Sequence, residues 1–288
     1  MRFILIFILL MNVAFACPVG PHEFMLSQMR GFGEPGPNES GISEEEFREN
    51  FTRVTDHYLP QFKAQGLEVN VILDWSNSWM NAQTGWTGAK SIKFFFSGAL
   101  ARIKYMTPDA LLFVACHEVG HHLGGFPKKD GGWATAEGGA DYFAALKCMR
   151  TILKGDEKNS RAQSLEIHPE VRARCHEVYA DEDEYFICLR TAQAGDDMGR
   201  AFKHFATKAP VGSLFFSELP NVTTTLSGYP SHACRVETAY QGAICSRGPE
   251  YPISYKDEAS GYCHENNGDT FGMRPRCWFV PTLKSAGE

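Results

Sequence analysis

The stretch Ala115-Cys-His-Glu-Val-Gly-His-His-Leu-Gly-Gly125 lies near the middle of a chain of 288 residues. It contains the pattern H-E-x-x-H, formed by His117, Glu118 and His121. On an α-helix, side chains four residues apart lie on one face, so both imidazoles can reach one cation with Glu118 beside them. The segment therefore predicts a helix that carries two metal-ligating histidines.

The residues after His121 bear on the third ligand. They follow the metzincin spacing H-E-x-x-H-x-x-G-x-x-H as far as Gly124, but Pro127 occupies the position of the third histidine. Proline has no side chain that can bind a metal, and the next histidine, His168, is too distant in sequence to complete the pattern. The metzincin ligand set is therefore excluded.

A second helix is expected from about Trp133 to Lys154, because its apolar residues recur at helical spacing and Gly155 follows it. Glu137 and Asp141 lie four residues apart on this helix and hence on one face. We expect Glu137 to be the third metal ligand. Asp141 would accept the remaining N–H of a ligating histidine and fix its tautomer.

Two histidines and a glutamate are a recurrent ligand set of catalytic zinc, which keeps its fourth position for water. Zinc lowers the pKa of that water, and a carboxylate within hydrogen-bond reach can remove its proton. Glu118 follows the first ligand directly and is the candidate general base. The sequence thus predicts a zinc hydrolase with one Zn²⁺ per chain.

The flanking sequence predicts an α+β fold with a small sheet and a mostly helical lower half. Thr107-Pro-Asp109 has the cap, proline and acidic residue that begin a helix, and Ser43-Glu-Glu-Glu46 opens another over Ser43 to Tyr58. Apolar runs predict strands at Leu67 to Leu73 and Ser91 to Ala99, with a loop over Trp75 to Thr87. Further helices are expected at about 169–178, 182–194 and 197–207.

H-E-x-x-H followed by Glu137-Gly-Gly-Ala-Asp141 resembles the gluzincins and, within them, the family of the prenyl-protein CAAX endopeptidases and their soluble periplasmic relatives. Two other segments are similar to that family's pattern. Asn81-Ala82 and Lys90 to Leu100 resemble the Asn-Ala segment and the edge strand that lead into the metal helix, and Tyr229 to Arg235 resembles a His-Pro-x-x-x-x-Arg element.

This resemblance implies a zincin-like endopeptidase whose edge strand, over Ile92 to Gly98, pairs with an extended peptide. The substrate-binding residues that it implies are Asn81, Ala82, Ile92, Phe94 and Phe96. Where the family has a histidine that steadies the oxyanion, this chain has Tyr229, whose hydroxyl can donate the same hydrogen bond. His232 is the alternative donor, or both are packing residues, and Arg235 would support the site or the substrate.

The N-terminus indicates export. Arg2, the apolar run Phe3 to Phe15 and Ala14-Phe-Ala16 have the layout of a signal peptide, which leaves a periplasmic or secreted protein. The run is too short for a confident membrane span, so contact with a membrane is expected only through a lipid on Cys17, an alternative that the sequence leaves open. A net charge of −6 gives no basic footprint for nucleic acid, and a protein or peptide substrate is the expected partner.

Nine cysteines in a chain with a signal peptide favour disulfides. Without Cys17, eight remain, an even number compatible with four bridges. Bridges among the four C-terminal cysteines are expected to tie down the tail; these are Cys234, Cys245, Cys263 and Cys277. Cys116 is interpreted as a packing residue or half of a bridge.

The expected organisation is a signal peptide over 1–16, an N-terminal extension over 17–60, a gluzincin-like metallopeptidase domain over 61–245 and a cysteine-containing tail over 246–288. Two other functions fit the same motifs. One is a zinc amidohydrolase that acts on cell-wall peptide or acyl bonds. The other is a non-enzymatic exported binding protein with structural zinc, which would need a fourth protein ligand such as Cys116 or His122.

Overall fold

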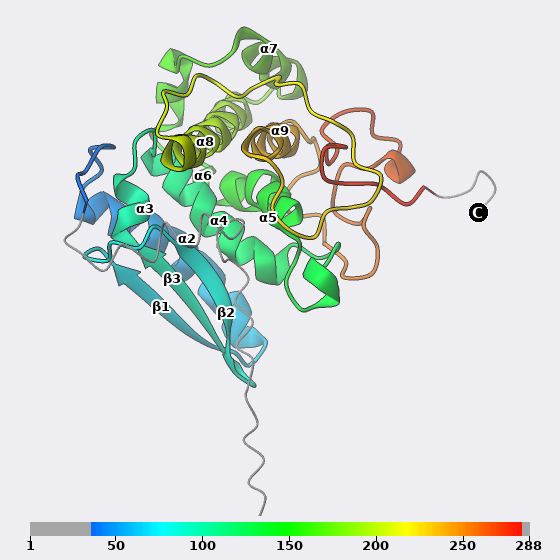
Figure 1. The fold of residues 1–288 in the computed structure, drawn as a ribbon. Coiled ribbons are helices and arrows are strands. Elements are labelled where there is room, and N and C mark those ends of the chain that lie inside the picture. The colour runs from blue at the N-terminus through cyan, green and yellow to red at the C-terminus, as the bar shows by residue number, and fades with distance from the viewer. Residues whose placement is uncertain (1–35, 284–288) are drawn as a thin grey trace, which may run out of the picture.

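A three-stranded sheet and a larger group of helices make up the part of the chain that the computed structural model describes, residues 36–283 (Figure 1). The strands are β1 (Glu68–Asp74), β2 (Ala82–Gly88) and β3 (Ser91–Ser97), in the spatial order β1-β3-β2. β3 pairs in parallel with β1 and antiparallel with β2. The expected α+β class with a small sheet is confirmed.

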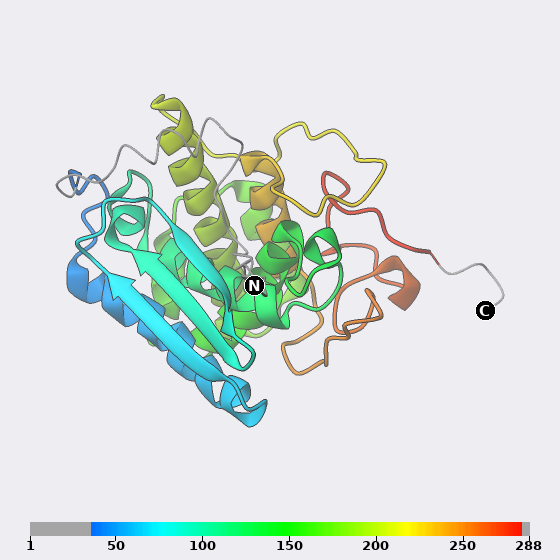
Figure 2. The same ribbon diagram turned by 60° about the horizontal axis from the view of Figure 1, so that its bottom comes forward.

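Helix α2 (Glu44–Ala64) lies along one face of the sheet, as Figure 2 shows. It begins with a capping box, in which the Ser43 hydroxyl accepts from the Glu46 N–H and the Glu46 carboxylate accepts from the Ser43 N–H. The ring of Phe51 on this helix stacks on that of Phe96 on β3, with 4.0 Å between the centroids. The apolar face of α2 therefore anchors the sheet to the rest of the core.

Helix α4 (Pro108–Leu123) runs through the centre of the molecule (Figure 1). The Thr107 hydroxyl caps it by accepting from the Ala110 N–H, as its sequence predicts, and all residues from Ala110 to Leu123 are buried. The second predicted helix is α5 (Glu137–Phe143), which continues through a π-helical segment (Ala144–Met149) into α6 (Arg150–Leu153). A Cβ on Gly120 of α4 would lie 2.9 Å from the Ala140 carbonyl oxygen, so the two helices approach closely there.

The remaining helices surround this pair. They are α3 (Gly98–Arg102), α7 (Pro169–Val178), α8 (Glu182–Thr207) and α9 (His232–Ala243), with short 3₁₀ turns at Lys129–Gly131, Asn159–Ser164 and Glu265–Asn267. The sequence predicts two helices where α8 is continuous. Gly195 lies at the expected break, but it allows close helix packing, since a Cβ there would lie 2.3 Å from that of Ala239 on α9.

Two expectations about the sheet are wrong. Residues 75–87 are not all loop, because β2 begins at Ala82. Ile92 to Gly98 is not an edge strand, because β3 is paired on both sides. Among the described strands, β2 and β1 hold the two edges.

Four disulfides cross-link the helical side of the described chain. They are Cys116–Cys148, Cys175–Cys188, Cys234–Cys277 and Cys245–Cys263. The expected bridges in the tail are present, and of the two interpretations of Cys116 the structure shows half of a bridge. Within residues 36–283, no helix combines the length and the apolar character that crossing a membrane requires. The expected signal peptide and Cys17 lie outside the described residues.

Candidate metal centre

The three predicted ligands meet in the core, although they come from two helices. Nε2 of His117 lies 3.3 Å from Oε2 of Glu137, and Nε2 of His121 lies 3.7 Å from the same oxygen. All three ligand atoms lie within 4.8 Å of one another. Ligand atoms about 2 Å from a tetrahedral ion lie roughly 3.3 Å apart, so this group could hold a metal ion with little rearrangement.

In both imidazoles a hydrogen bond at Nδ1 fixes the orientation of the ring. Nδ1 of His117 lies 2.8 Å from Oδ1 of Asp141, and Nδ1 of His121 lies 2.9 Å from the carbonyl oxygen of Thr135. A carboxylate and a carbonyl can only accept, so each Nδ1 carries the proton and each Nε2 presents its lone pair toward Glu137. Burial lowers the pKa of His121 to about 4, which keeps it neutral and able to bind a metal near neutral pH.

Glu137 is completely buried and accepts a hydrogen bond on the oxygen that faces away from the histidines. Nζ of Lys129 lies 2.7 Å from Oε1 of Glu137. Burial alone would raise the pKa of this carboxyl, but His121, His117 and Lys129 together hold it well below its usual range. Glu137 is therefore an anion whose Oε2 faces the two histidines.

Asp141 links the His117 ring to a buried arginine. Arg235 on α9 donates two hydrogen bonds of 2.8 Å, one to each oxygen of Asp141. Burial opposes ionisation of Asp141, yet the Arg235 guanidinium outweighs it and lowers the pKa of the carboxyl. Contacts therefore run from Arg235 through Asp141 to the His117 ring. This arrangement agrees with the prediction that both residues support the site.

Glu118 and Tyr229 line one small cavity with His117 and Arg235. Its volume is about 30 Å³, which exceeds the 10–15 Å³ or so that a water molecule requires. Glu118 is 1% exposed. Of the two oxyanion donors that the sequence left open, only Tyr229 lies on this cavity, since His232 is not part of its lining.

The predicted substrate-binding residues fall into two groups. Ala82 lies at the start of β2 and lines the same cavity, whereas the Asn81 side chain just before it is fully buried and makes no hydrogen bond within the described chain. The other three are core residues, because β3 is central and its inward side chains pack under α2: Ile92, Phe94 and Phe96. Because β3 is paired with both β1 and β2, its backbone cannot add a substrate strand, so the expectation for these three residues is corrected.

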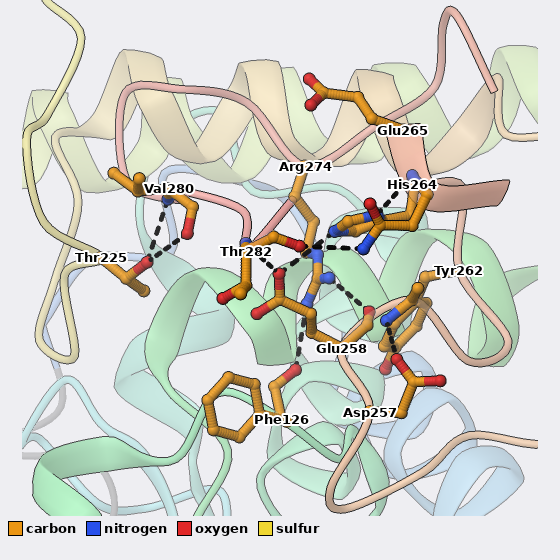
Figure 3. Close-up of polar contacts among 12 residues, drawn as sticks. Phe126, Thr225, Asp257, Glu258, Tyr262, His264, Glu265, Arg274, Val280 and Thr282 are labelled. Atoms are coloured by element: carbon orange, nitrogen blue, oxygen red, sulfur yellow. Dashed lines mark hydrogen bonds and ion pairs between the residues drawn. The ribbon is translucent and has the colours of Figure 1, made fainter. Parts of the chain in front are cut away.

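The C-terminal tail packs against the helix that carries Glu137. A Cβ on Gly138, next to Glu137, would lie 2.3 Å from the Trp278 ring, so α5 rests directly on this indole. Figure 3 shows Arg274 donating to the carbonyl oxygens of Phe126 and Glu258, and thereby joining the tail to the loop after α4. The tail is thus part of the wall behind Glu137.

Sequence reasoning missed Lys129 and the tail contacts. The pair Lys128-Lys129 follows Pro127, but a lysine pair in a loop gives no signal of its partner. Trp278 lies 140 residues beyond Gly138, and the short pattern around it predicts no contact. Both contacts depend on the folded path of loops, which local patterns do not specify.

Comparison with models of protein families, with curated proteins and with solved structures gave no match to this chain.

Proposed function

We propose that this protein is an exported zinc-dependent endopeptidase of the gluzincin type, related to the CAAX-endopeptidase-like family. The observation that carries the proposal is the meeting of His117, His121 and Glu137 beside a water-sized cavity lined by Glu118. The donor set of two imidazoles and one carboxylate favours zinc over magnesium or calcium, which prefer oxygen ligands. Three protein ligands leave one position open, as catalytic zinc sites do.

A bound zinc ion would supply Lewis-acid polarisation of the scissile carbonyl and of the attacking water. Glu118 would take the proton of the water and pass it to the leaving amine. Tyr229, on the same cavity, would donate its hydroxyl proton in a hydrogen bond to the developing oxyanion. Asp141 and Arg235 would hold the His117 ring in place during the reaction.

An extended substrate would add to β2 instead of β3. In the described sheet, β2 is an edge strand, and only its other side is paired, with β3. Met80, two residues before Ala82 at the start of β2, lines the cavity together with Ala82 and Glu118. Backbone groups of an edge strand accept a further strand without selecting its sequence. Strand addition there would bring a peptide bond to the cavity.

The binding-protein alternative has less support. Neither residue expected as its fourth ligand is available, because Cys116 is disulfide-bonded to Cys148 and the His122 ring bonds to the Thr84 hydroxyl at 2.7 Å. A zinc amidohydrolase would use the same centre, so substrate choice separates it from an endopeptidase. The four disulfides agree with an oxidising environment, which export would provide.

The test is a cleavage assay on the purified mature protein with casein, matched peptides and peptidoglycan fragments. We expect peptide-bond cleavage that a chelator abolishes and zinc restores. Glu118→Gln should reduce kcat by at least about 100-fold, since it removes the general base. Chelator-insensitive cleavage, or an unchanged rate in Glu118→Gln, would contradict the mechanism, and cleavage of peptidoglycan alone would favour the amidohydrolase.

A further inference from the structure

A second cavity, of about 450 Å³, lies where the end of β2, the end of α4 and the loop before α5 come together. We call it the Lys128 pocket. Its walls are mainly aromatic: Phe62, Trp86, Trp133 and Tyr255, with His122 and Lys128 beside them. The Trp133 ring lies 4.6 Å from that of His122 and 6.1 Å from that of Trp86, so these walls support one another. Such a preformed, largely apolar cavity with a few polar groups is typical of a ligand site.

The Lys128 pocket adjoins the metal centre along the chain at three points. His122 follows the ligand His121, and Trp133 lies four residues before Glu137. Lys128 has extended backbone angles (φ −93°, ψ 148°), so its side chain and that of Lys129 project to opposite sides of the loop. Lys129 points to Glu137 and Lys128 to the pocket.

The pocket also lies along the proposed path of the substrate. Trp86 belongs to β2, four residues after Ala82, which lines the cavity of Glu118. An extended peptide beside β2 advances about 3.3 Å per residue, so a few residues separate the reacting bond from the pocket. The Lys128 pocket is therefore placed to receive a substrate side chain or chain end on one side of that bond.

Lys128 is the only lysine, arginine, aspartate or glutamate among the described residues that line this pocket. Its Nζ lies 4.6 Å from the centre of the Tyr255 ring, and none of the ion pairs in residues 36–283 involves it. Burial lowers the pKa of Lys128 to about 8, so it is still mostly protonated at neutral pH. By contrast, Lys129 is paired with Glu137. A half-buried ammonium with an aromatic partner and no carboxylate is suited to bind an anion.

His122 is already engaged in the wall of the pocket. Its Nε2 is bonded to the Thr84 hydroxyl at 2.7 Å. The Tyr255 hydroxyl is likewise engaged, since it donates to the His122 carbonyl oxygen at 3.2 Å. The pocket therefore offers a ligand one ammonium group, that of Lys128, surrounded by aromatic rings.

We propose that the Lys128 pocket is a specificity subsite that binds a carboxylate of the substrate. This rests on the proposed peptidase function and names its substrate class, peptides with an acidic group a few residues from the cleaved bond. The carboxylate belongs either to an acidic side chain or to the C-terminus of the peptide, and both offer the same chemistry to Lys128.

The experiment uses fluorogenic peptides that differ by Glu, Gln or Lys at one position, scanned along the peptide, each with a free and an amidated C-terminus. The parent should cleave the acidic peptide about 10- to 100-fold faster in kcat/KM than its Gln counterpart, as expected for a charge-assisted hydrogen bond. Lys128→Gln should remove this preference, Lys128→Arg should keep it and Lys128→Glu should shift it toward Lys peptides. The amidated and free series distinguish a side-chain carboxylate from a C-terminal one.

Lys104→Gln is the matched control, because Lys104 is exposed and its Nζ also lies near a tyrosine ring, 5.4 Å from the centre of Tyr105, but it is not part of the pocket. Its acid preference should equal that of the parent. The subsite is refuted if the parent cleaves Glu and Gln peptides equally, or if Lys128→Gln keeps the preference.

Binding to the Glu118→Gln protein, measured by fluorescence anisotropy with the same peptides, separates this inference from the proposed function. Acid-dependent binding that Lys128→Gln abolishes would sustain the subsite even if no peptide were hydrolysed, and the peptidase proposal alone would fail. Hydrolysis with equal binding of Glu and Gln peptides would sustain the peptidase and refute the subsite.

Discussion

The two helices that carry the candidate metal ligands pack against each other, and each is also supported by a different part of the molecule. Helix α4, with His117 and His121, packs against α2 and β2 in an aromatic core, and Cys116–Cys148 joins it to the helical segment that continues from α5. Helix α5, with Glu137, rests on Trp278 in a tail that Cys234–Cys277 and Cys245–Cys263 cross-link. The two histidines therefore lie on a helix that is supported mainly by the aromatic core, whereas the helix that carries Glu137 also rests on Trp278 in the tail.

The largest effects are expected when one buried aromatic residue is replaced, either Trp278 beside α5 or Phe96 in the core beside α4. Trp278→Ala and Phe96→Ala should each lower the free energy of unfolding by about 3–5 kcal/mol, because both rings are fully buried. Only Trp278→Ala should also weaken zinc binding in the folded protein, since it removes the support of α5. Urea unfolding and competition with a chromophoric chelator measure the two quantities. Equal loss of zinc affinity in both variants would show that Trp278 has no special role in supporting Glu137.

Asp141→Asn should have the next largest effect. It leaves the buried Arg235 without its anion, which should lower the free energy of unfolding by about 3 kcal/mol. It also leaves one acceptor oxygen for both His117 and Arg235, so the His117 ring is held less firmly and zinc affinity should fall about 10- to 100-fold.

The matched control is Asp109→Asn, because Asp109 also accepts two hydrogen bonds from one arginine, Arg190, at 2.8 and 2.6 Å, but contacts no ligand. This variant should lose stability and keep the zinc affinity of the parent. A weakened zinc site in Asp109→Asn would show that the contacts of Asp141 are not what orients His117.

The smallest expected effect is on how the free energy of unfolding depends on pH. Burial, with the nearby charges of Arg235 and Lys203, lowers the pKa of His232 to about 4, while the unfolded chain has a value near 6.5. Between these values the unfolded state binds the proton and the folded state does not, so stability falls as the pH decreases from 6.5 toward 4. His232→Gln should reduce the loss of stability between pH 7 and pH 5 by about 1–2 kcal/mol. An identical pH slope in the variant would contradict this assignment.

Local signals were sufficient for the two helices that carry the candidate metal ligands. Thr107-Pro108-Asp109 begins α4 at the predicted residue, and the four-residue spacings of the histidines and of Glu137 and Asp141 survive folding because helices preserve them. The burial of Cys116 in a bridge agrees with its position on a buried helix.

Features that depend on distant segments were not predictable in the same way. The sequence of β2, Ala-Gln-Thr-Gly-Trp-Thr-Gly, contains two glycines and no Val or Ile, so it forms a strand only because β3 pairs with it. That pairing also decides which strand is the edge. Lys129 and Trp278 reach the site from loops, whose path no periodic pattern describes.

The most direct measurement of the central claim is the zinc content of the purified mature protein after dialysis, determined by mass spectrometry for the parent, Glu118→Gln and Glu137→Gln. The parent and Glu118→Gln should each retain one zinc per chain, because Glu118 is not a ligand. Glu137→Gln should lose most of its zinc while it remains folded by circular dichroism. Full zinc occupancy in folded Glu137→Gln, or no zinc in the parent after incubation with the metal, would contradict a centre built from His117, His121 and Glu137.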